Sequence, residues 1–210
     1  MRRVSREGGD AEGTGEYSWP GAAARGQTAW VIIREATEAD WPAIWPFLHR
    51  IVAAGDTFTW PRDISEELAR EIWMKRPPGR TVVAVAEDGT VLGSAETHPN
   101  QMGPGSHIAN AGFMVDEAHA GRGVGRALCA HVIEQARADG YRAIQYNAVA
   151  SSNSRAVALW KSFGFTVLAA VPEGFLHPEL GYVDLLVMYL PLTETEAAVE
   201  AGAGAEPPVR

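Results

Sequence analysis

Between residues 29 and 192, apolar positions recur with two different periods. Short runs rich in β-branched residues predict strands, and longer segments with apolar residues three or four positions apart predict amphipathic helices. The predicted strands are 29–36, two strands of a hairpin within 81–99, and 108–116, 142–150, 165–171 and 181–192. The predicted helices are 41–55, 64–76, 123–139 and 154–163.

Turn and capping residues mark the ends of these elements. Asp88-Gly89 joins the two strands of the hairpin and is the strongest short turn signal in the chain. Thr37, with Asp40 three residues later, is typical of a helix N-terminus, and Gly140 closes the helix 123–139. The resulting order is β-αα-βββ-α-β-α-ββ, which predicts an α/β fold with a mixed sheet and helices on both of its faces.

The two ends of the chain lack such patterns. Residues 1–28 are rich in Gly, Arg and Glu without an apolar period, and residues 193–210 have the same character. Segments of this composition cannot bury enough apolar surface to fold. We therefore predict a disordered N-terminal extension at 1–28, one folded domain at 29–192 and a disordered C-terminal tail at 193–210.

Composition and charge narrow the function classes. The chain has 210 residues, of which 46% are hydrophobic, and a formal net charge of −8. This charge argues against nucleic-acid binding, because phosphate neutralisation needs a basic surface. No apolar run is long enough to span a membrane. Cys129 is the single cysteine and the six histidines lack metal-ligand spacing, so we expect neither a disulfide nor a metal site, in a cytoplasmic protein.

The segment 119–128, HAGRGVGRAL, joins a predicted strand to a predicted helix. Backbone N–H groups at a helix N-terminus and the helix dipole attract phosphate. Glycines allow close approach of a ligand, and the arginines add charge that pairs with phosphate. On its own, the segment fits an ordinary turn that starts a helix equally well. It is neither a Walker loop nor a Rossmann fingerprint, because its spacing differs from both.

A second motif follows at 147–165, NAVASSNSRAVALWKSFGF, in which Asn153 precedes a predicted helix and Gly164 ends it. Together with FMVDEAHAGRGVGRAL at 113–128 and the order of elements across 29–192, it resembles the GNAT superfamily of acyl-CoA-dependent N-acetyltransferases. The resemblance implies a twisted, mostly antiparallel sheet, acetyl-CoA as co-substrate and no metal.

The resemblance also implies cofactor-binding residues. In the family, the backbone of one strand pairs with the pantetheine arm, the glycine loop wraps the pyrophosphate, and an asparagine at the next helix start contacts the arm. The matching residues are Phe113, Met114 and Val115 in the strand, Gly121, Arg122, Gly123, Val124, Gly125 and Arg126 in the loop, and Asn153. The family strand that carries the arm splays from the next strand, and the cofactor fills the opening.

Two positions depart from the family pattern. Ala120 stands where the family usually has Gln or Arg, which removes a side-chain contact but no backbone donor. Trp160 stands where many members carry the Tyr that returns a proton to the leaving thiolate. An indole N–H does not supply that proton. We therefore predict that Trp160 packs in the core or lines the site, and that the proton comes from another group or from water.

The chemistry of acetyl transfer directs attention to three residues. The reaction needs a neutral amine, its alignment with the thioester, and donors for the developing oxyanion. Asn110 and Asn147 lie inside predicted strands, where asparagine is unfavourable. The chain most resembles a branch that includes azetidine-2-carboxylate acetyltransferases, whose matching asparagines bind substrate and stabilise the oxyanion. Glu96 is a candidate base that acts through water, and a surface or edge carboxylate is the alternative.

Acceptor-binding residues are expected in loops at one end of this fold. The segment 55–61, between the first two helices, carries Phe58 and Trp60, which are candidates for an apolar wall. Tyr182 in the last strand is a further candidate. His98 and His107 flank the loop 99–106 and rank below Glu96, because a lone loop histidine is more often solvated. The segment 174–182 looks long enough to cover an open groove.

These features predict an N-acetyltransferase that moves an acetyl group from acetyl-CoA to the amine of a small molecule. Direct attack is expected rather than an acetyl-enzyme, because Cys129 lies mid-helix without a basic partner in sequence. Two alternatives stay open, namely a protein or peptide N-terminal acetyltransferase and a catalytically silent acyl-CoA sensor. Family members are often dimers, so a homodimer is an open expectation.

Overall fold

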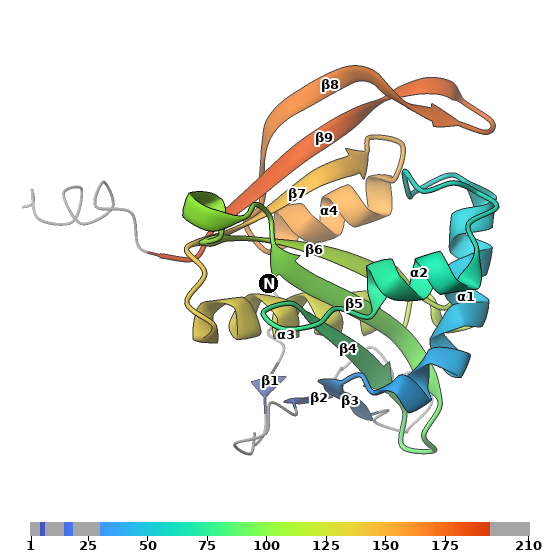
Figure 1. Ribbon diagram of the computed structural model, residues 1–210, viewed down its shortest axis with the longest axis vertical. Coiled ribbons are helices and arrows are strands. Elements are labelled where there is room, and N and C mark those ends of the chain that lie inside the picture. The colour runs from blue at the N-terminus through green and yellow to red at the C-terminus, as the bar shows by residue number, and fades with distance from the viewer. Residues whose placement is uncertain (1–4, 7–14, 19–29, 194–210) are drawn as a thin grey trace, which may run out of the picture.

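The strands form one mixed sheet (Figure 1). A computed structural model describes residues 5–6, 15–18 and 30–193 of the chain. Its nine described strands lie in the order β1-β2-β3-β4-β5-β6-β7-β9-β8, and among them β6 and β7 form the single parallel pair. The strands are β1 Ser5–Arg6, β2 Gly15–Ser18, β3 Trp30–Glu35, β4 Arg80–Val85, β5 Val91–Pro99, β6 Ile108–Val115, β7 Ala143–Ala150, β8 Thr166–His177 and β9 Gly181–Pro191.

From residue 30 onward, the elements follow the predicted order, and the α/β class is confirmed. The α-helices are α1 Trp41–Ala54, α2 Glu66–Trp73, α3 Val124–Ala138 and α4 Ser154–Ser162. Short 3-10 helices lie at Glu38–Asp40, Gly103–Gly105 and Glu117–His119. Helix α2 is shorter than the predicted 64–76, because Ser65 caps its start and Met74, with ψ 83°, leaves the helical conformation.

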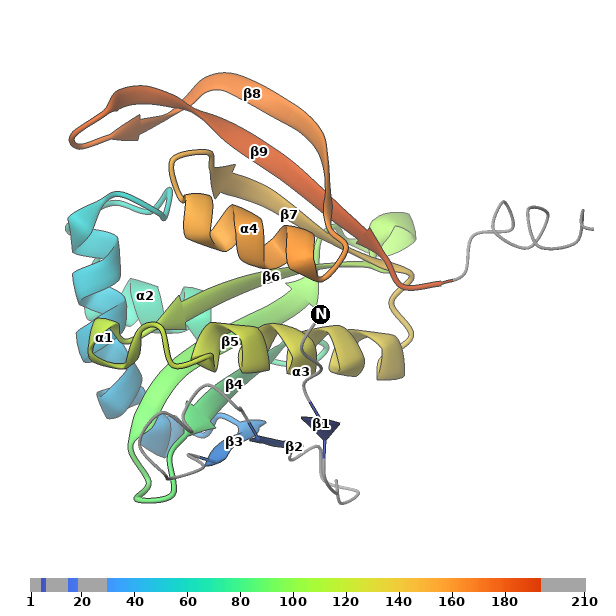
Figure 2. The same ribbon diagram turned by 180° about the vertical axis from the view of Figure 1, so that it is seen from behind.

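The sheet separates two apolar cores. Along β4, Val82 and Ala84 belong to one core while Val83 and Val85 belong to the other, as the two-residue period of a strand requires. The first core includes residues of α3 and α4, and the second includes residues of α1 and α2. Figures 1 and 2 show these two pairs of helices from opposite sides of the sheet. Helices therefore cover both faces, as predicted.

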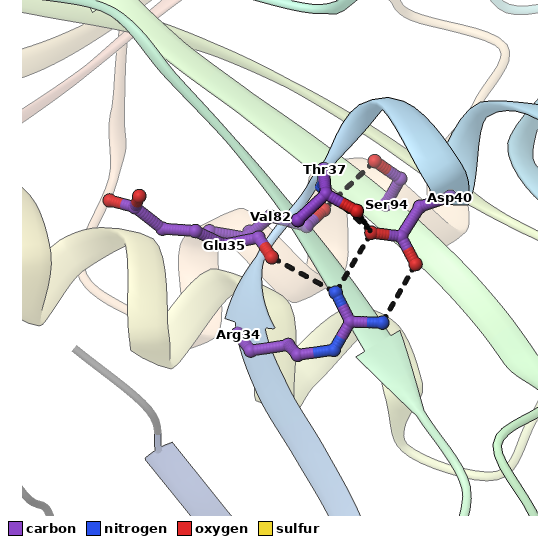
Figure 3. Close-up of polar contacts among 6 residues, drawn as sticks. All are labelled: Arg34, Glu35, Thr37, Asp40, Val82 and Ser94. Atoms are coloured by element: carbon purple, nitrogen blue, oxygen red, sulfur yellow. Dashed lines mark hydrogen bonds and ion pairs between the residues drawn. The ribbon is translucent and has the colours of Figure 1, made fainter. Parts of the chain in front are cut away.

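A carboxylate fixes the entry into α1. Asp40 accepts hydrogen bonds from the backbone N–H and the hydroxyl of Thr37, at 2.7 and 3.0 Å (Figure 3). It also accepts two hydrogen bonds from the guanidinium of Arg34, at 2.8 and 2.7 Å. The Arg34 guanidinium is the main reason that the pKa of Asp40 is lowered to about 2. The pairing of Thr37 with Asp40 that the sequence indicates is present, and Arg34 extends it to β3.

Strands β6 and β7 part after two residue pairs. They pair at Ile108 with Ala143 and at Ala109 with Ile144. Beyond these pairs, β6 continues beside β5 as far as Val115, and β7 continues beside β9 as far as Ala150. The sheet therefore opens between two of its inner strands, which is the kind of opening that the family resemblance implies.

The last two strands form a long hairpin that arches over the rest of the sheet (Figure 1). The segment 174–182, which the sequence suggests could cover an open groove, belongs to this hairpin, and its role as a cover stays a prediction. Phe175 pairs with Val183 and His177 pairs with Gly181, so the strands take up most of the segment and leave a turn at 178–180. For the same reason β8 extends well past its predicted end at residue 171. Most of β8 is exposed to solvent.

Much of the chain ends lies beyond what the structure describes. The predicted disorder of 1–28 and 193–210 falls mostly on residues outside the described ranges. The described parts of 1–28 are β1 and β2, and β2 pairs with β3 in antiparallel orientation. Within the described ranges, no helix has the length and apolar character needed to cross a membrane.

Candidate active site

A cavity lies where β6 and β7 part. It is lined by residues 110–113 of β6, residues 146–150 of β7 and residues 57–60 between α1 and α2, together with Glu96, Asn153, Ala156 and Trp160. The opening in the sheet thus brings together segments that are far apart in the sequence. Among the residues predicted from the sequence, the cavity gathers Phe58, Trp60, Glu96, Asn110, Phe113, Asn147 and Asn153.

Two asparagine amides of the cavity are held by local hydrogen bonds. Asn147 donates from Nδ2 to Oδ1 of Asn100 at 2.6 Å, and its Oδ1 accepts from Nε2 of Gln145 at 2.9 Å. The Oδ1 of Asn110 accepts from the backbone N–H of Ala111 at 2.9 Å. Because an amide nitrogen carries two hydrogens, Asn147 can bind Asn100 and still donate to a second acceptor.

Glu96 is the buried carboxylate of the cavity, with 8% of the residue exposed. Its Oε2 lies 2.7 Å from Nδ1 of His98 and 3.6 Å from Nζ of Lys75. Its Oε1 lies above Gly112, where an added Cβ would come within 2.9 Å of that oxygen. The absence of a side chain at residue 112 therefore makes room for the carboxylate. Its burial distinguishes Glu96 from a solvated surface carboxylate.

Segment 57–60 contributes an aromatic wall. Phe58, Trp60 and Trp73 contact one another edge to face, with ring centroids 5.6 to 6.3 Å apart. Nε1 of Trp73 donates to Oγ of Ser94 at 2.9 Å, which ties α2 to β5. The hydroxyl of Thr57 is buried and has no hydrogen-bond partner within the described part of the chain. It can therefore receive a polar group of a bound acceptor.

Trp160 packs in an aromatic cluster beside the cavity. Its ring lies 4.8 Å from that of Phe113 and 5.2 Å from that of Tyr146, between centroids. The prediction that Trp160 is a packing or lining residue is confirmed. Burial raises the pKa of the Tyr146 hydroxyl and that of the Cys129 thiol well above their ordinary values. Cys129 therefore stays protonated near neutral pH and is a poor nucleophile.

The glycine loop forms the N-terminus of α3. Gly121 and Gly123 adopt φ values of 75° and 83°, in the left-handed region that favours glycine. Arg122 is exposed, and the guanidinium of Arg126 lies 5.2 Å from the ring centroid of Phe163. The unpaired N–H groups of a helix start, with arginines beside them, are suited to bind an anion. Two further predicted residues, Met114 and Val124, are each 2% exposed, and each packs in one of the two apolar cores.

The family follows from the sequence of this same region. The profile described as the Acetyltransferase (GNAT) family matches residues 34–165, which is more than half of the chain. The chain belongs to the GNAT family. The GNAT match contains β6, the glycine loop, β7 and α4. It also contains every residue that lines the cavity, because these residues lie between 57 and 160.

Solved GNAT structures share the fold along nearly their whole length. A GCN5-related N-acetyltransferase from Kribbella flavida is 53% identical, with a TM-score of 0.75 over 77% of this chain and 97% of that chain. The yncA structure from Salmonella typhimurium, which contains its cofactor acetyl-CoA, is 27% identical, with a TM-score of 0.67 over 79% and 95% of the two chains.

Two curated proteins are similar in sequence to this GNAT chain. N-acetyltransferase aca1 of Schizosaccharomyces pombe is 30% identical over 53% of this chain, which spans about half (54%) of that protein's length. The L-methionine sulfoximine/L-methionine sulfone acetyltransferase of Salmonella typhimurium is 31% identical over 57% of this chain and 69% of its own length.

Some residues of this GNAT site differ from the sequence-based expectation. Tyr182 is 67% exposed on β9 and does not belong to the described lining of the cavity. Conversely, the sequence analysis did not select Thr57, Lys75 or Asn100, which lie outside the helices and strands of the structure. Their proximity to the cavity or to its lining residues depends on how the loops fold. Within the described ranges, no three His, Cys, Asp or Glu side chains lie close enough together to hold a metal ion.

Proposed function

We propose that this chain moves an acetyl group from acetyl-CoA to the amine of a small molecule. The observation that carries the proposal is the cavity between β6 and β7, which joins a buried carboxylate, three asparagine side chains and an aromatic wall. Similar proteins support it, since yncA binds acetyl-CoA and a relative 31% identical is named for acetylating L-methionine sulfoximine and L-methionine sulfone.

Two parts of the chain are suited to bind acetyl-CoA. Past residue 109, the edge of β6 that faces β7 offers backbone groups to the amides of the pantetheine arm, as a neighbouring strand would. The start of α3 offers N–H groups to the pyrophosphate, and Arg122 and Arg126 add positive charge. Asn153 lines the cavity, and its Oδ1 caps α4 by accepting from the N–H of Ala156 at 3.1 Å.

The cavity residues divide the chemistry among them. Glu96 takes a proton from the acceptor amine through water, and the amine nitrogen then bonds to the thioester carbon. Asn110 and Asn147 donate N–H groups to the oxyanion, as amide side chains do in other acyl transfers. When the carbon–sulfur bond breaks, the nitrogen gives its extra proton to water and the thiolate takes a proton from water, because the indole of Trp160 cannot supply one.

Direct attack fits this chain better than an acetyl-enzyme. Cys129 is completely buried in α3, and its raised pKa keeps the thiol protonated. A single buried cysteine also fits a reducing compartment, so we propose the cytoplasm as the location.

The direct test measures free CoA released from acetyl-CoA with a panel of amines. The panel contains amino acids and their analogues, polyamines, aminoglycosides and short peptides with free N-termini. We expect turnover with at least one small amine and little with peptides. Thermal stabilisation by acetyl-CoA without turnover of any amine would instead indicate a catalytically silent acyl-CoA sensor, which the replacement of tyrosine by Trp160 allows.

A further inference from the structure

The carboxylate of Glu96 is held from one side. Both polar contacts of the carboxylate described above use Oε2, which faces His98 Nδ1 at 2.7 Å and Lys75 Nζ at 3.6 Å. The other oxygen, Oε1, lies above Gly112, and Gly112 and Glu96 both line the cavity. The two oxygens therefore have different surroundings, and Oε1 is the one beside the cavity wall.

His98 is better placed than Lys75 to fix this orientation. A carboxylate only accepts hydrogen bonds, so the Nδ1–H of His98 must donate to Oε2 when Glu96 is ionised. A hydrogen bond of 2.7 Å is directional, whereas an ion pair at 3.6 Å is not. The two residues lie two positions apart on β5 and so share one face of the strand. The side chain of His98 is 30% exposed, while that of Glu96 is 10% exposed.

We propose that His98 is a positioning residue that acts on the acceptor amine only through Glu96. Its Nδ1–H holds Oε2, which leaves Oε1 directed along Gly112 toward the acceptor. The inference rests on the proposed function, because it assumes that Glu96 is the base. His98 pairs with Asn110, another proposed catalytic residue, across the β5–β6 ladder. The histidine therefore lies beside the reacting groups, although it does not line the described cavity.

Three substitutions separate positioning from a simple structural role. His98→Asn keeps an N–H donor near the place of Nδ1, His98→Ala removes it, and Lys75→Met removes the ion pair. We expect His98→Ala to lower kcat by up to about 100-fold, the cost of a misplaced catalytic group, with KM for acetyl-CoA unchanged. We expect His98→Asn to recover most of that loss and Lys75→Met to cost less than His98→Ala. His107→Asn is the matched control, because His107 is also beside the loop but bonds to the carbonyl of Pro104.

The double variant Glu96→Gln/His98→Ala supplies the decisive comparison. If His98 acts only through Glu96, the double variant has the kcat of Glu96→Gln alone. A wild-type kcat in His98→Ala, or an equal further loss on the Glu96→Gln background, overturns the proposal. Melting temperatures of all variants separate a loss of kcat from a loss of folded protein.

A structural measurement tests the positioning even if the proposed function fails. Failure of that function appears as wild-type protein that turns over no amine in the panel. Crystal structures of His98→Ala and His98→Asn then decide the question without an assay. We expect the Glu96 carboxylate to leave its place above Gly112 in the first variant and to keep it in the second. A carboxylate that stays in place in His98→Ala overturns the proposal.

Discussion

At the scale of single residues, Asn147 combines an exposed position with a constrained amide. Its side chain is bonded to both Gln145 and Asn100, although the residue itself is exposed on β7. Such a group is oriented before a substrate arrives, which is what an oxyanion donor requires. Its loss should therefore affect the reaction more than the fold.

We expect Asn147→Ala to lower kcat by about 100-fold or more, the usual effect of removing one oxyanion donor. The melting temperature should change little, because surface substitutions outside the core cost little stability. Gln145→Ala is the control, since it removes the neighbouring amide and leaves Asn147 bonded to Asn100. Full turnover by Asn147→Ala would show that the oxyanion assignment is wrong.

The pair of Arg34 and Asp40 makes a prediction about acid stability. The folded-state pKa of Asp40 is lowered to about 2, below the ordinary value of 3.8, so the ionised form is favoured by folding. Its contribution is complete above about pH 4 and is lost as the pH falls toward 2. The contribution amounts to at most about 2 kcal/mol of unfolding free energy.

Asp40→Asn should lose this contribution at neutral pH and should flatten the pH dependence of stability between about pH 4 and 2. Urea unfolding across that range measures both effects. A cycle with Arg34→Met isolates the coupling of the pair, and additive losses in the double variant would contradict the assignment.

At the scale of elements, the start of α3 shapes the fold and is proposed to bind acetyl-CoA. Gly123 caps the helix with φ 83°, and a side chain there is strained by about 1–2 kcal/mol. Gly140, just past the end of the same helix, has φ 81° and lies far from any neighbouring atom that a Cβ would meet. The two glycines therefore form a matched pair at opposite ends of one helix.

We expect Gly123→Ala and Gly140→Ala to lower stability by similar amounts, about 1–2 kcal/mol each. Only Gly123→Ala should weaken acetyl-CoA binding, because it disturbs the N–H groups at the helix start. Isothermal titration with acetyl-CoA and thermal unfolding measure the two effects. Equal affinities of the two variants for acetyl-CoA would show that the glycine loop is not part of the binding site.

The elements also show what the sequence could and could not predict. Helix and strand positions follow from local periodicity, and the glycine loop carries a sequence motif. Both could therefore be predicted from the sequence alone. The end of β8 was not, because residues past 171 become strand only by pairing with β9. In the same way, Lys75 and Asn100 reach Glu96 and Asn147 through loops, and no spacing along the chain records such contacts.

At the scale of the whole molecule, two pairs of residues join β6 to β7 and hold the central part of the sheet together. On one side lie β1 to β6, and on the other lie β7, β9 and β8. A ligand that fills the opening bonds to both sides at once, and it binds the folded chain alone. It should therefore stabilise the molecule by an amount that grows with the logarithm of its concentration relative to its Kd.

Acetyl-CoA at 100 times its Kd should add about 2.7 kcal/mol to the unfolding free energy. Hydrogen exchange should slow at residues 110–113 and 146–150, which line the opening. ADP, which has the pyrophosphate but no pantetheine arm, is the control and should leave exchange in these strands unchanged. Equal protection by both ligands would mean that the arm does not occupy the opening.

The exposed outer strand has a consequence for self-association. An edge strand presents unpaired backbone groups that can recruit another chain, and β8 carries exposed apolar residues such as Leu168. However, two register shifts and Pro172 interrupt it, and no run longer than three residues keeps regular pairing with β9. Amyloid-type stacking requires straight segments of about six or seven residues. The irregularities of β8 thus make it a poor template for fibril growth, although the strand still pairs with β9 in the hairpin.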